Sequence, residues 1–271
     1  MTTDQAGFDA LTQHISRTAG VSLGNYKDKC LRRRIAVRMR ACGVHTYAEY
    51  QAVLARTPAE YEHLKDTLTI NVTRFFRNAE TWQRLAEDFL PPLLAQVPGT
   101  IRVWSAGCSS GEEAYGLAIL IADAALALGD TRSLERVHVD ATDIDRKSLE
   151  RASEGRYRAD ALCETAPEVR ERYFEAEADG WRVSAAVRRR VRVRQHDLGR
   201  DPAPGTFHLI VCRNVVIYFE RATQERLFET FWQALLPGGL LVLGKVEALL
   251  GPARERLQLV HPRERIYRRP A

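Results

Sequence analysis

The spacing of apolar residues divides the chain into two parts with different periods. In the first part apolar positions recur every three or four residues, as Phe8, Leu11 and Ile15 do, and this is the spacing of an amphipathic helix. In the second part short apolar runs alternate with amphipathic segments, which indicates a parallel α/β sheet. We therefore expect a helical N-terminal domain over residues 1–90 and an α/β domain over residues 91–271, joined where prolines and glycine are frequent.

Two helix starts in the N-terminal domain carry capping signals. Thr46 followed by Glu49 forms a capping box. Thr57 and Glu60 form a second one, with a proline at the first helical position. These signals predict short helices that begin directly after each threonine.

The alternation also predicts the elements of the α/β domain. Strands are expected over residues 101–104, 136–142, 207–213 and 240–244, with a closing antiparallel pair at 257–260 and 265–268. Helices are expected over residues 112–128, 144–153 and 221–235. Residues 181–194 alternate like a hairpin, with valines on one face and arginines on the other. The arginine face is equally consistent with a solvated surface and with a second surface for an anion.

A loop of small residues follows the first strand of this domain. Residues 105–111 read SAGCSSG, and Glu112 and Glu113 then open a helix. Small residues let a backbone approach a ligand closely, and the helix start offers free amides. The two carboxylates would repel a pyrophosphate, and the spacing matches neither the G-x-G-x-x-G of dinucleotide folds nor a P-loop. We expect a neutral or cationic ligand here, the alternative being an ordinary strand-to-helix turn.

Polar residues follow two further strands. Asp143 and Asp145 come directly after the 136–142 strand, where an acid of a Rossmann-like unit can accept both ribose hydroxyls of a nucleoside. Asn214 and Tyr218 follow the 207–213 strand, at the edge where open α/β sheets bind ligands. The acids favour a ligand that contains a nucleoside.

The positive charge of the chain is concentrated in one segment. The formal net charge is +5, and residues 27–40, KDKCLRRRIAVRMR, hold seven basic residues and one acidic residue. In a helix the apolar residues of this segment take one face. Such a charged face can be merely solvated, but the strong bias indicates a docking surface for an anionic partner, either nucleic acid or an acidic protein helix. The residues expected on this face are Lys27, Arg33, Arg34, Arg38 and Arg40.

Targeting and metal signals are missing from the sequence. The N-terminus has no basic segment followed by an apolar one, and no apolar run is long enough to span a bilayer. A cytoplasmic protein is therefore expected. The five cysteines show no metal-ligand spacing, which predicts reduced thiols and no metal site.

Five motifs, taken in order, resemble those of the CheR family, the S-adenosylmethionine-dependent protein-glutamate O-methyltransferases that modify bacterial chemoreceptors. The motifs are NVTRFFR at 71–77, WSAGCSSGEEAY at 104–115, ATDID at 141–145, VRVRQHDL at 191–198 and CRNVVIYF at 212–219. The resemblance implies a helical domain that docks the acidic methylation helices of receptors. It also implies a Rossmann-like methyltransferase domain with a small antiparallel β-subdomain at about residues 174–194.

The resemblance assigns residues to a site for S-adenosylmethionine, with S-adenosylhomocysteine as the product. Glu113 is expected to bind the methionine part and Asp143 the ribose. Asp197 and Leu198 are expected at the adenine edge. The other residues expected around the cofactor are Asn71, Thr73, Arg77, Gly107, Arg213 and Asn214.

Two residues are expected near the transferred methyl group, Arg77 and Tyr218. The acceptor glutamate has a reference pKa of roughly 4.3 and is ionised at neutral pH, so no general base is required. Catalysis then consists of alignment and the removal of water from the nucleophile. Arg77 could orient the acceptor carboxylate by charge, and Tyr218 could do so by a softer hydrogen bond.

Three features depart from the family pattern. Asp197 stands where members usually have asparagine, and it should still accept from the adenine amino group. Lys245 replaces the histidine of the family's G-H-S-E, which here reads GKVE. The stretch before Trp181, EAEADG, is shorter than the glycine-rich loop of members that tether to a receptor's C-terminal pentapeptide. We therefore expect this protein to work without such a tether.

Two other functions are compatible with the same motifs. One is an S-adenosylmethionine-dependent nucleic-acid methyltransferase, but the chain has no Asn/Asp-Pro-Pro-Tyr/Phe motif and its basic helix has no interleaved aromatics for base stacking. The other is a non-catalytic signalling adaptor, against which the presence of Arg77, Glu113, Asp143 and Tyr218 argues. The receptor methyltransferase is favoured, with no nucleic-acid partner and no insertion into a membrane.

Overall fold

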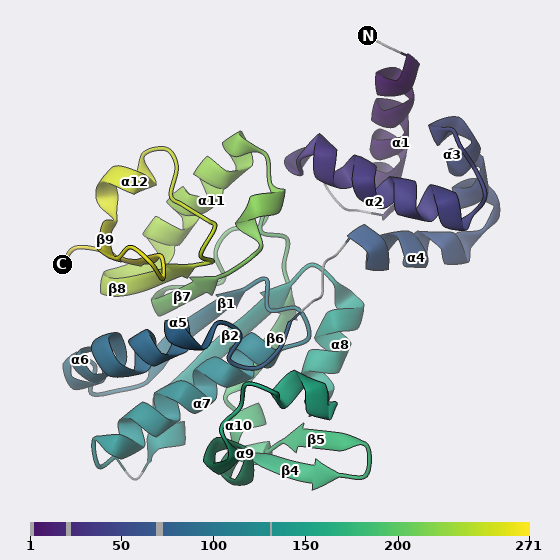
Figure 1. The fold of residues 1–271 in the computed structure, drawn as a ribbon. Helices are drawn as coiled ribbons and strands as arrows, with labels where there is room; N and C mark the ends of the chain where they lie inside the picture. Colours follow the sequence, from purple (N-terminus) through teal and green to yellow (C-terminus); the bar gives the residue numbers. More distant parts are fainter. Residues whose placement is uncertain (1–2, 20–22, 69–72, 131) are drawn as a thin grey trace. The chain divides into compact units, whose positions relative to one another are not determined.

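The computed structural model describes residues 3–19, 23–68, 73–130 and 132–271. Its contacts form two compact units (Figure 1). The helical unit holds residues 1–70 together with 218–223, and the sheet unit holds residues 71–217 together with 224–271. A segment that follows a strand of the sheet unit therefore belongs, by its contacts, to the helical unit.

The helical unit is a small bundle with its own core. Its helices are α1 (Thr3–Ala19), α2 (Asp28–Ala41), α3 (Tyr47–Arg56) and α4 (Pro58–Leu68), with a 3₁₀ turn η1 (Leu23–Asn25). The apolar residues expected at helical spacing pack together, among them Phe8, Leu11, Ile15 and Ile35. The capping box at the start of α3 is confirmed: the amide of Glu49 donates to the Thr46 hydroxyl, and the Glu49 carboxylate accepts from the Thr46 amide.

The capping box predicted at the start of α4 is not formed. Glu60 is 5% exposed and instead accepts two hydrogen bonds from the Arg38 guanidinium, at 2.9 and 2.7 Å, and one from the Tyr50 hydroxyl at 2.8 Å. Burial opposes the ionisation of Glu60, but the bonds from Arg38 and Tyr50 outweigh it and lower the pKa of Glu60. A buried two-bond pair with arginine is stronger than a cap exposed to water, and it ties α2, α3 and α4 together.

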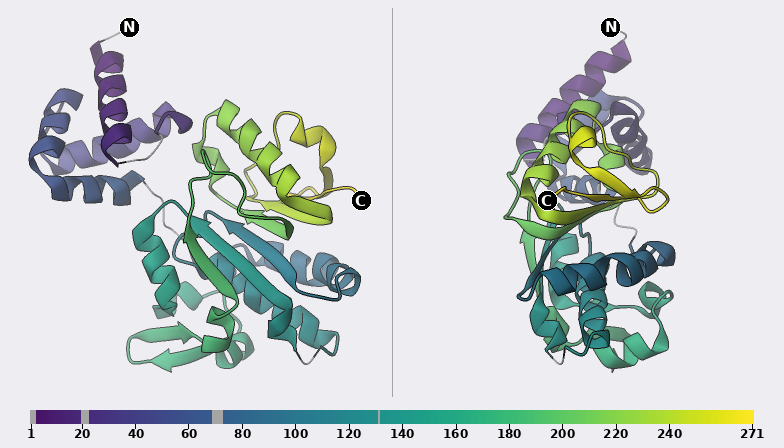
Figure 2. Two further views of the ribbon diagram at one scale, coloured as in Figure 1. Left: turned by 180° about the vertical axis from the view of Figure 1, so that it is seen from behind. Right: turned by 90° about the vertical axis from the view of Figure 1, so that its left-hand side faces the viewer.

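The sheet unit is built on a seven-stranded sheet of order β6-β2-β1-β7-β8-β10-β9 (Figures 1 and 2). The first five strands run parallel, and β10 pairs antiparallel with both β8 and β9. The strands are β1 (Ile101–Ala106), β2 (Val137–Asp143), β6 (Val191–Gln195), β7 (Phe207–Cys212), β8 (Leu235–Leu243), β9 (Gln258–His261) and β10 (Ile266–Arg268). The α/β class, the central place of the 207–213 strand and the closing antiparallel pair are as expected.

Helices cover both faces of this sheet. Ile101 and Val103 of β1 share a core with apolar residues of α7. The next residue, Trp104, packs on Phe231 of α11, with ring centres 5.4 Å apart. The helices are α5 (Ala79–Arg84), α6 (Leu90–Gln96), α7 (Glu112–Ala127), α8 (Arg146–Glu154), α9 (Pro167–Tyr173), α10 (Ala185–Arg188), α11 (Arg221–Ala234) and α12 (Ala253–Arg256), with shorter turns η2 (Leu85–Phe89), η3 (Ser133–Arg136), η4 (Ala159–Leu162) and η5 (Val216–Tyr218).

The boundary between the units lies about twenty residues before the one expected from the sequence. The units divide between residues 70 and 71, whereas the expected boundary was at residue 90. The reason is that Phe75, Trp82, Leu85 and Leu90 are buried in the core of the sheet unit. Helical periodicity does not reveal which core a helix joins.

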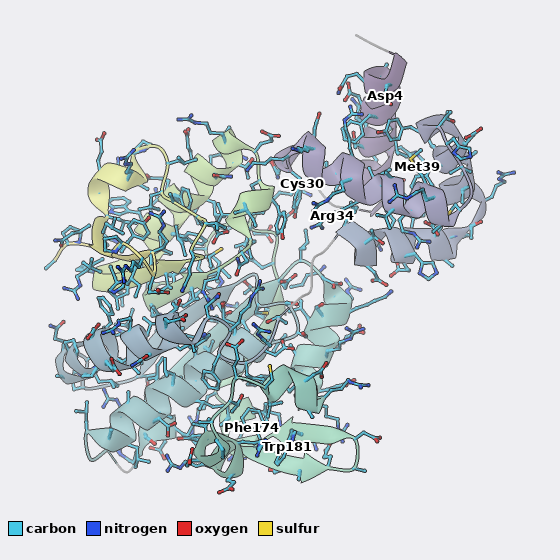
Figure 3. The ribbon with its side chains drawn as sticks, in the orientation of Figure 1. Asp4, Cys30, Arg34, Met39, Phe174 and Trp181 are labelled. Carbon is cyan, nitrogen blue, oxygen red and sulfur yellow. The ribbon has the colours of Figure 1, made fainter. Side chains whose placement is uncertain are left out.

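The antiparallel sheet is smaller than expected. It consists of β3 (Arg156–Tyr157), β5 (Gly180–Val183) and β4 (Phe174–Glu177) in that order. Phe174 and Trp181 mark its two longer strands in Figure 3. Residues 191–195 do not form a hairpin with it, because they are β6 and pair in parallel with β2. The arginines of this strand are not purely a solvated face either, since Arg194 donates to the buried carboxylate of Asp140 at 2.6 Å.

In the described part of the chain no helix has the length and apolar character needed to cross a membrane.

Candidate active site

The strand order reverses at the carboxyl ends of β1 and β7, where open α/β sheets have their ligand-binding crevice. The chain proceeds from β1 to β2 and β6 on one side and then crosses to β7 on the other, and open α/β sheets bind ligands at such a switch point. The loops after the two strands touch. Gly107 has a φ of +87°, and a Cβ atom added at this position would lie only 2.5 Å from Cγ2 of Val215. Only glycine fits this close approach without strain.

Asp143 ends β2 at the edge of this crevice. Its two carboxylate oxygens accept from the amide of Ser109 at 2.8 Å and from the amide of Asp145 at 2.9 Å. Burial raises the pKa of Asp143, and these amides oppose the rise. The amide of His196, at the end of β6, donates to the Asp143 carbonyl at 2.9 Å, which brings the neighbouring Asp197 and Leu198 to the same edge.

Glu113 lies one residue into α7. Its carboxylate accepts from the Ser105 hydroxyl at 2.9 Å and stands 3.7 Å from Nη1 of Arg213. Burial raises the pKa of Glu113, while the positive charge of Arg213 opposes the rise. Glu113 and Asp143 both act electrostatically on the thiol of Cys108 between them, and its pKa is raised, first by burial and then by these two acids. The two acids therefore lie near the same thiol at this edge of the sheet.

Arg213, directly after β7, joins this site to the segment before α5. Its Nη2 atom donates to the Arg77 carbonyl at 2.9 Å and to Oδ1 of Asn78 at 2.8 Å. The Trp82 indole donates to the same carbonyl at 2.9 Å. Nε of Arg213 is buried and has no hydrogen-bond partner among the described residues. The sequence did not point to Asn78 and Trp82, because neither residue lies within one of the recognised motifs.

Arg77 also lines an open pocket of about 770 Å³ within the sheet unit. Thr73 and Ser110 line the same pocket, so the 73–77 segment and the loop after β1 face a common space. The pocket wall is rich in arginine, with Arg74, Arg77, Arg151, Arg156 and Arg158. Asn71, the remaining predicted member of this segment, lies outside the described residues.

Asn214 is held by a residue whose role the sequence did not reveal. Glu247 is 3% exposed, and its carboxylate accepts from the backbone amides of Asn214, Val215, Ile217 and Gly244 at 2.6 to 3.3 Å. Burial raises the pKa of Glu247, and the amides oppose the rise. This clasp fixes the loop after β7, including the left-handed Asn214 with φ of +60°. The sequence signal that could have indicated this role is an acid, Glu247, placed three residues after Gly244 at the end of β8.

Lys245, which replaces the family histidine, forms ion pairs with two acids of the sheet unit. Its ammonium lies 3.2 Å from Glu80 at the start of α5 and 3.3 Å from the buried Glu264. Thr81 also donates to Glu264 at 2.5 Å. Lys245 thus fastens α5 to the end of β8, close in sequence to Arg77.

Tyr218 lies in the helical unit. Its backbone carbonyl accepts from the amide of Lys27, the N-cap residue of α2, at 2.9 Å. Its ring faces the guanidinium of Arg34, whose central carbon is 5.0 Å from the ring centre. Of the predicted site residues that follow β7, Arg213 and Asn214 belong to the sheet unit, and Tyr218 belongs to the helical unit.

The basic face of α2 differs from the predicted one. Arg34 is only 9% exposed, and Arg38 is paired with Glu60, so neither presents a free charge to a partner. Lys29, Arg33 and Arg40 are exposed and lie at helical spacing, and no described acid lies within ion-pair distance of them.

Comparison with known proteins defines the class first. Residues 71–265 match the family model described as "CheR methyltransferase, SAM binding domain", and residues 6–69 match "CheR methyltransferase, all-alpha domain". The sheet unit is thus an S-adenosylmethionine-binding methyltransferase domain, and S-adenosylmethionine is its cofactor. The two matches meet where the compact units divide.

Curated relatives narrow the class. A chemotaxis protein methyltransferase of Listeria monocytogenes is 35% identical over 89% of this chain and 90% of its own. Those of Klebsiella aerogenes and Escherichia coli are 37% and 34% identical, each over 89% of this chain and over 83% and 84% of their own lengths. The chain belongs to the CheR methyltransferase family, which confirms the resemblance inferred from the sequence.

The residues at the crevice fit this cofactor. S-adenosylmethionine carries a sulfonium, an ammonium, a carboxylate and a ribose diol. Glu113 and Asp143 are partly buried acids with raised pKa values. They suit the cationic groups and the ribose diol, because a carboxylate in such a place gains from a nearby cation or hydrogen-bond donor. The unpartnered Nε of Arg213 suits a carboxylate.

Proposed function

We propose that this methyltransferase transfers a methyl group from S-adenosylmethionine to glutamate side chains of bacterial chemoreceptors, forming glutamyl methyl esters in chemotaxis-type adaptation. The observation that carries the proposal is the exposed row of Lys29, Arg33 and Arg40 on α2, which suits an acidic helix. The names of the curated relatives support the same substrate class.

Within this proposal the cofactor is held by residues of the crevice. Glu113 receives the methionine part and Asp143 the ribose, while Asp197 and Leu198 meet the adenine edge. The other residues around the cofactor are Asn71, Thr73, Arg77, Gly107, Arg213 and Asn214. Bound there, the cofactor supplies an activated methyl group on sulfur.

The catalytic task of the chain is then to align the acceptor. A glutamate is already ionised at neutral pH, so Arg77 and Tyr218 serve by orienting its carboxylate and by excluding water from it. A tight ion pair with Arg77 would lower the nucleophilicity of the carboxylate. The phenol of Tyr218 orients it by a weaker hydrogen bond.

The basic row on α2 offers a direct test. Arg33→Glu and Arg40→Glu should each raise the KM for a chemoreceptor fragment about five- to tenfold at low salt, because each reverses an exposed charge facing an acidic helix. The effect should shrink as salt rises. The measurement is transfer of labelled methyl groups into an alkali-labile ester that releases methanol, with the Kd for S-adenosylhomocysteine determined in parallel.

Arg17→Glu on α1 is the matched control, since Arg17 is an equally exposed arginine of the same unit. It should leave the KM unchanged. Equal effects of all three variants would contradict a specific docking row. Label that resists mild alkali, or that enters nucleic acid, would contradict the ester chemistry.

We further propose that the chain needs no C-terminal receptor tether. The β4 and β5 strands pair from Glu177 to Gly180, so only two residues connect them and no long loop lies between these two strands. Calorimetry with a receptor C-terminal pentapeptide should therefore show no binding. Micromolar or tighter binding would overturn this part of the proposal.

A further inference from the structure

Arg34 is a basic residue of α2 that lies outside the proposed docking row of Lys29, Arg33 and Arg40. It is 9% exposed, and Figure 3 shows it extending from α2. Its Nη2 atom is buried and has no hydrogen-bond partner among the described residues. A buried nitrogen without a hydrogen-bond partner costs free energy that an apolar residue would not, so the presence of arginine here calls for a reason other than packing.

The nearest aromatic group to this guanidinium is the ring of Tyr218, 5.0 Å away from carbon to ring centre. This distance lies within the range in which a cation is attracted to the face of an aromatic ring. Burial strengthens the attraction, because water does not compete for the guanidinium. The interaction therefore constrains the plane of the Tyr218 ring.

The backbone around Tyr218 is held independently of Arg34. The Tyr218 carbonyl accepts from the amide of Lys27, and the amide of Glu220 donates to the Asn25 carbonyl, at 2.9 and 2.8 Å. Between them Tyr26 and Phe219 form a β-bridge with ring centres 4.9 Å apart. The backbone contacts fix where the tyrosine stands, and the contact with Arg34 acts on its side chain.

We propose that Arg34 is a positioning residue that holds the phenol of Tyr218 in the orientation used for methyl transfer. The inference rests on the proposed role of Tyr218. It separates two functions on one helix: Lys29, Arg33 and Arg40 meet the partner on the outer face of α2, and Arg34 sets the catalytic tyrosine on the inner one.

Arg38 provides the contrast on the same helix. Its guanidinium has two hydrogen bonds to Glu60, so its position is explained by pairing within the unit. Removal of Arg38 should therefore reduce stability, whereas removal of Arg34 should reduce turnover. The two arginines are four residues apart and differ only in what they face.

The test is a double-mutant cycle between Arg34 and Tyr218. Arg34→Met should lower kcat about tenfold, the loss expected for one desolvated cation–π contact, with the Kd for S-adenosylhomocysteine and the KM for the receptor fragment unchanged. Tyr218→Phe should lower kcat as well. The double variant should be no slower than Tyr218→Phe alone, because residues that act through one another are not additive.

Arg34→Lys keeps the charge without the planar group and should lose kcat only several-fold, and it carries the test if Arg34→Met does not fold. A higher KM with unchanged kcat in the Arg34 variants would overturn the inference and make Arg34 a docking residue. Additive losses in the double variant would also overturn it. If Tyr218→Phe is slow and Arg34→Met is fully active, only this inference is wrong. If Tyr218→Phe is itself fully active, the proposed role of Tyr218 is wrong as well.

Discussion

Three acids of the sheet unit, of which Glu247 is buried and Asp143 and Glu113 are partly buried, differ in how their carboxylate oxygens are occupied. Glu247 accepts from backbone amides on both sides and belongs to the loop it clasps. Asp143 accepts one amide on each oxygen. Within the described residues, Glu113 accepts only the Ser105 hydroxyl, with Arg213 at a longer 3.7 Å. The least satisfied acid is therefore the one best suited to a cationic ligand.

The raised pKa of Glu113 gives cofactor binding a pH dependence of known sign. Binding of an ammonium group favours the ionised carboxylate, so Glu113 must release a proton wherever the free protein holds it protonated. Affinity for S-adenosylhomocysteine is then full above the raised pKa of Glu113 and falls as pH decreases below it. Calorimetry between pH 5 and pH 8 should show weaker binding at the acidic end and proton release on binding.

Glu113→Gln should weaken binding of S-adenosylhomocysteine about tenfold or more at pH 8, since a charge-assisted contact contributes about 1.5–3 kcal/mol, and it should flatten the pH profile. Glu112→Gln is the control, because burial also raises the pKa of Glu112 but its carboxylate is occupied by the Ser110 hydroxyl. A Glu113→Gln protein that kept both affinity and pH profile would refute the electrostatic account of the site.

At the scale of elements, the two faces of α2 show what sequence periodicity can and cannot predict. The spacing of Leu31, Ile35 and Met39 correctly predicted the buried stripe. It could not predict that Arg34 and Arg38 are also turned inward, because their partners, Tyr218 and Glu60, come from other elements. Whether a charged residue beside an apolar stripe is buried or exposed depends on its tertiary contacts.

The same limit applies to the strands. The order of strands and helices from residue 101 onward followed from alternation, whereas the expectation that Glu113 and Asp143 bind one cofactor came from the resemblance to the CheR family. Strand β6 was misread as a hairpin because local alternation does not distinguish an antiparallel neighbour from the distant, parallel β2. Glu247 was missed for a related reason: its ligands are backbone amides, which leave no mark in a sequence.

At the scale of the whole molecule, the chain returns to its first unit after building most of the second. Residues 218–223 belong to the helical unit by their contacts, although they run from the end of η5, after β7, into the first turn of α11. Each unit has its own apolar core. The residue proposed to orient the acceptor therefore depends on the folding of the helical unit.

This return predicts a pattern of amide hydrogen exchange. The Ile35→Ala variant removes a fully buried side chain of the helical core and should destabilise that unit by about 2–5 kcal/mol. The amide of Glu220, bonded to the Asn25 carbonyl, should then exchange faster together with the amides of α2, while that of Ile210 in β7 keeps its rate. Exchange of Glu220 in step with Ile210 instead would show that this segment opens with the sheet.

The buried contact of Arg38 with Glu60 and Tyr50 has a consequence for how partner choice can diverge. It joins three helices through charges that neutralise one another, so the helical unit does not draw its stability from the outer row of α2. Substitutions at such exposed positions usually change the free energy of unfolding by less than about 0.5 kcal/mol. The residues of the row can therefore be substituted, in evolution or by design, so that they bind a different receptor, while the helical unit that carries them keeps its structure.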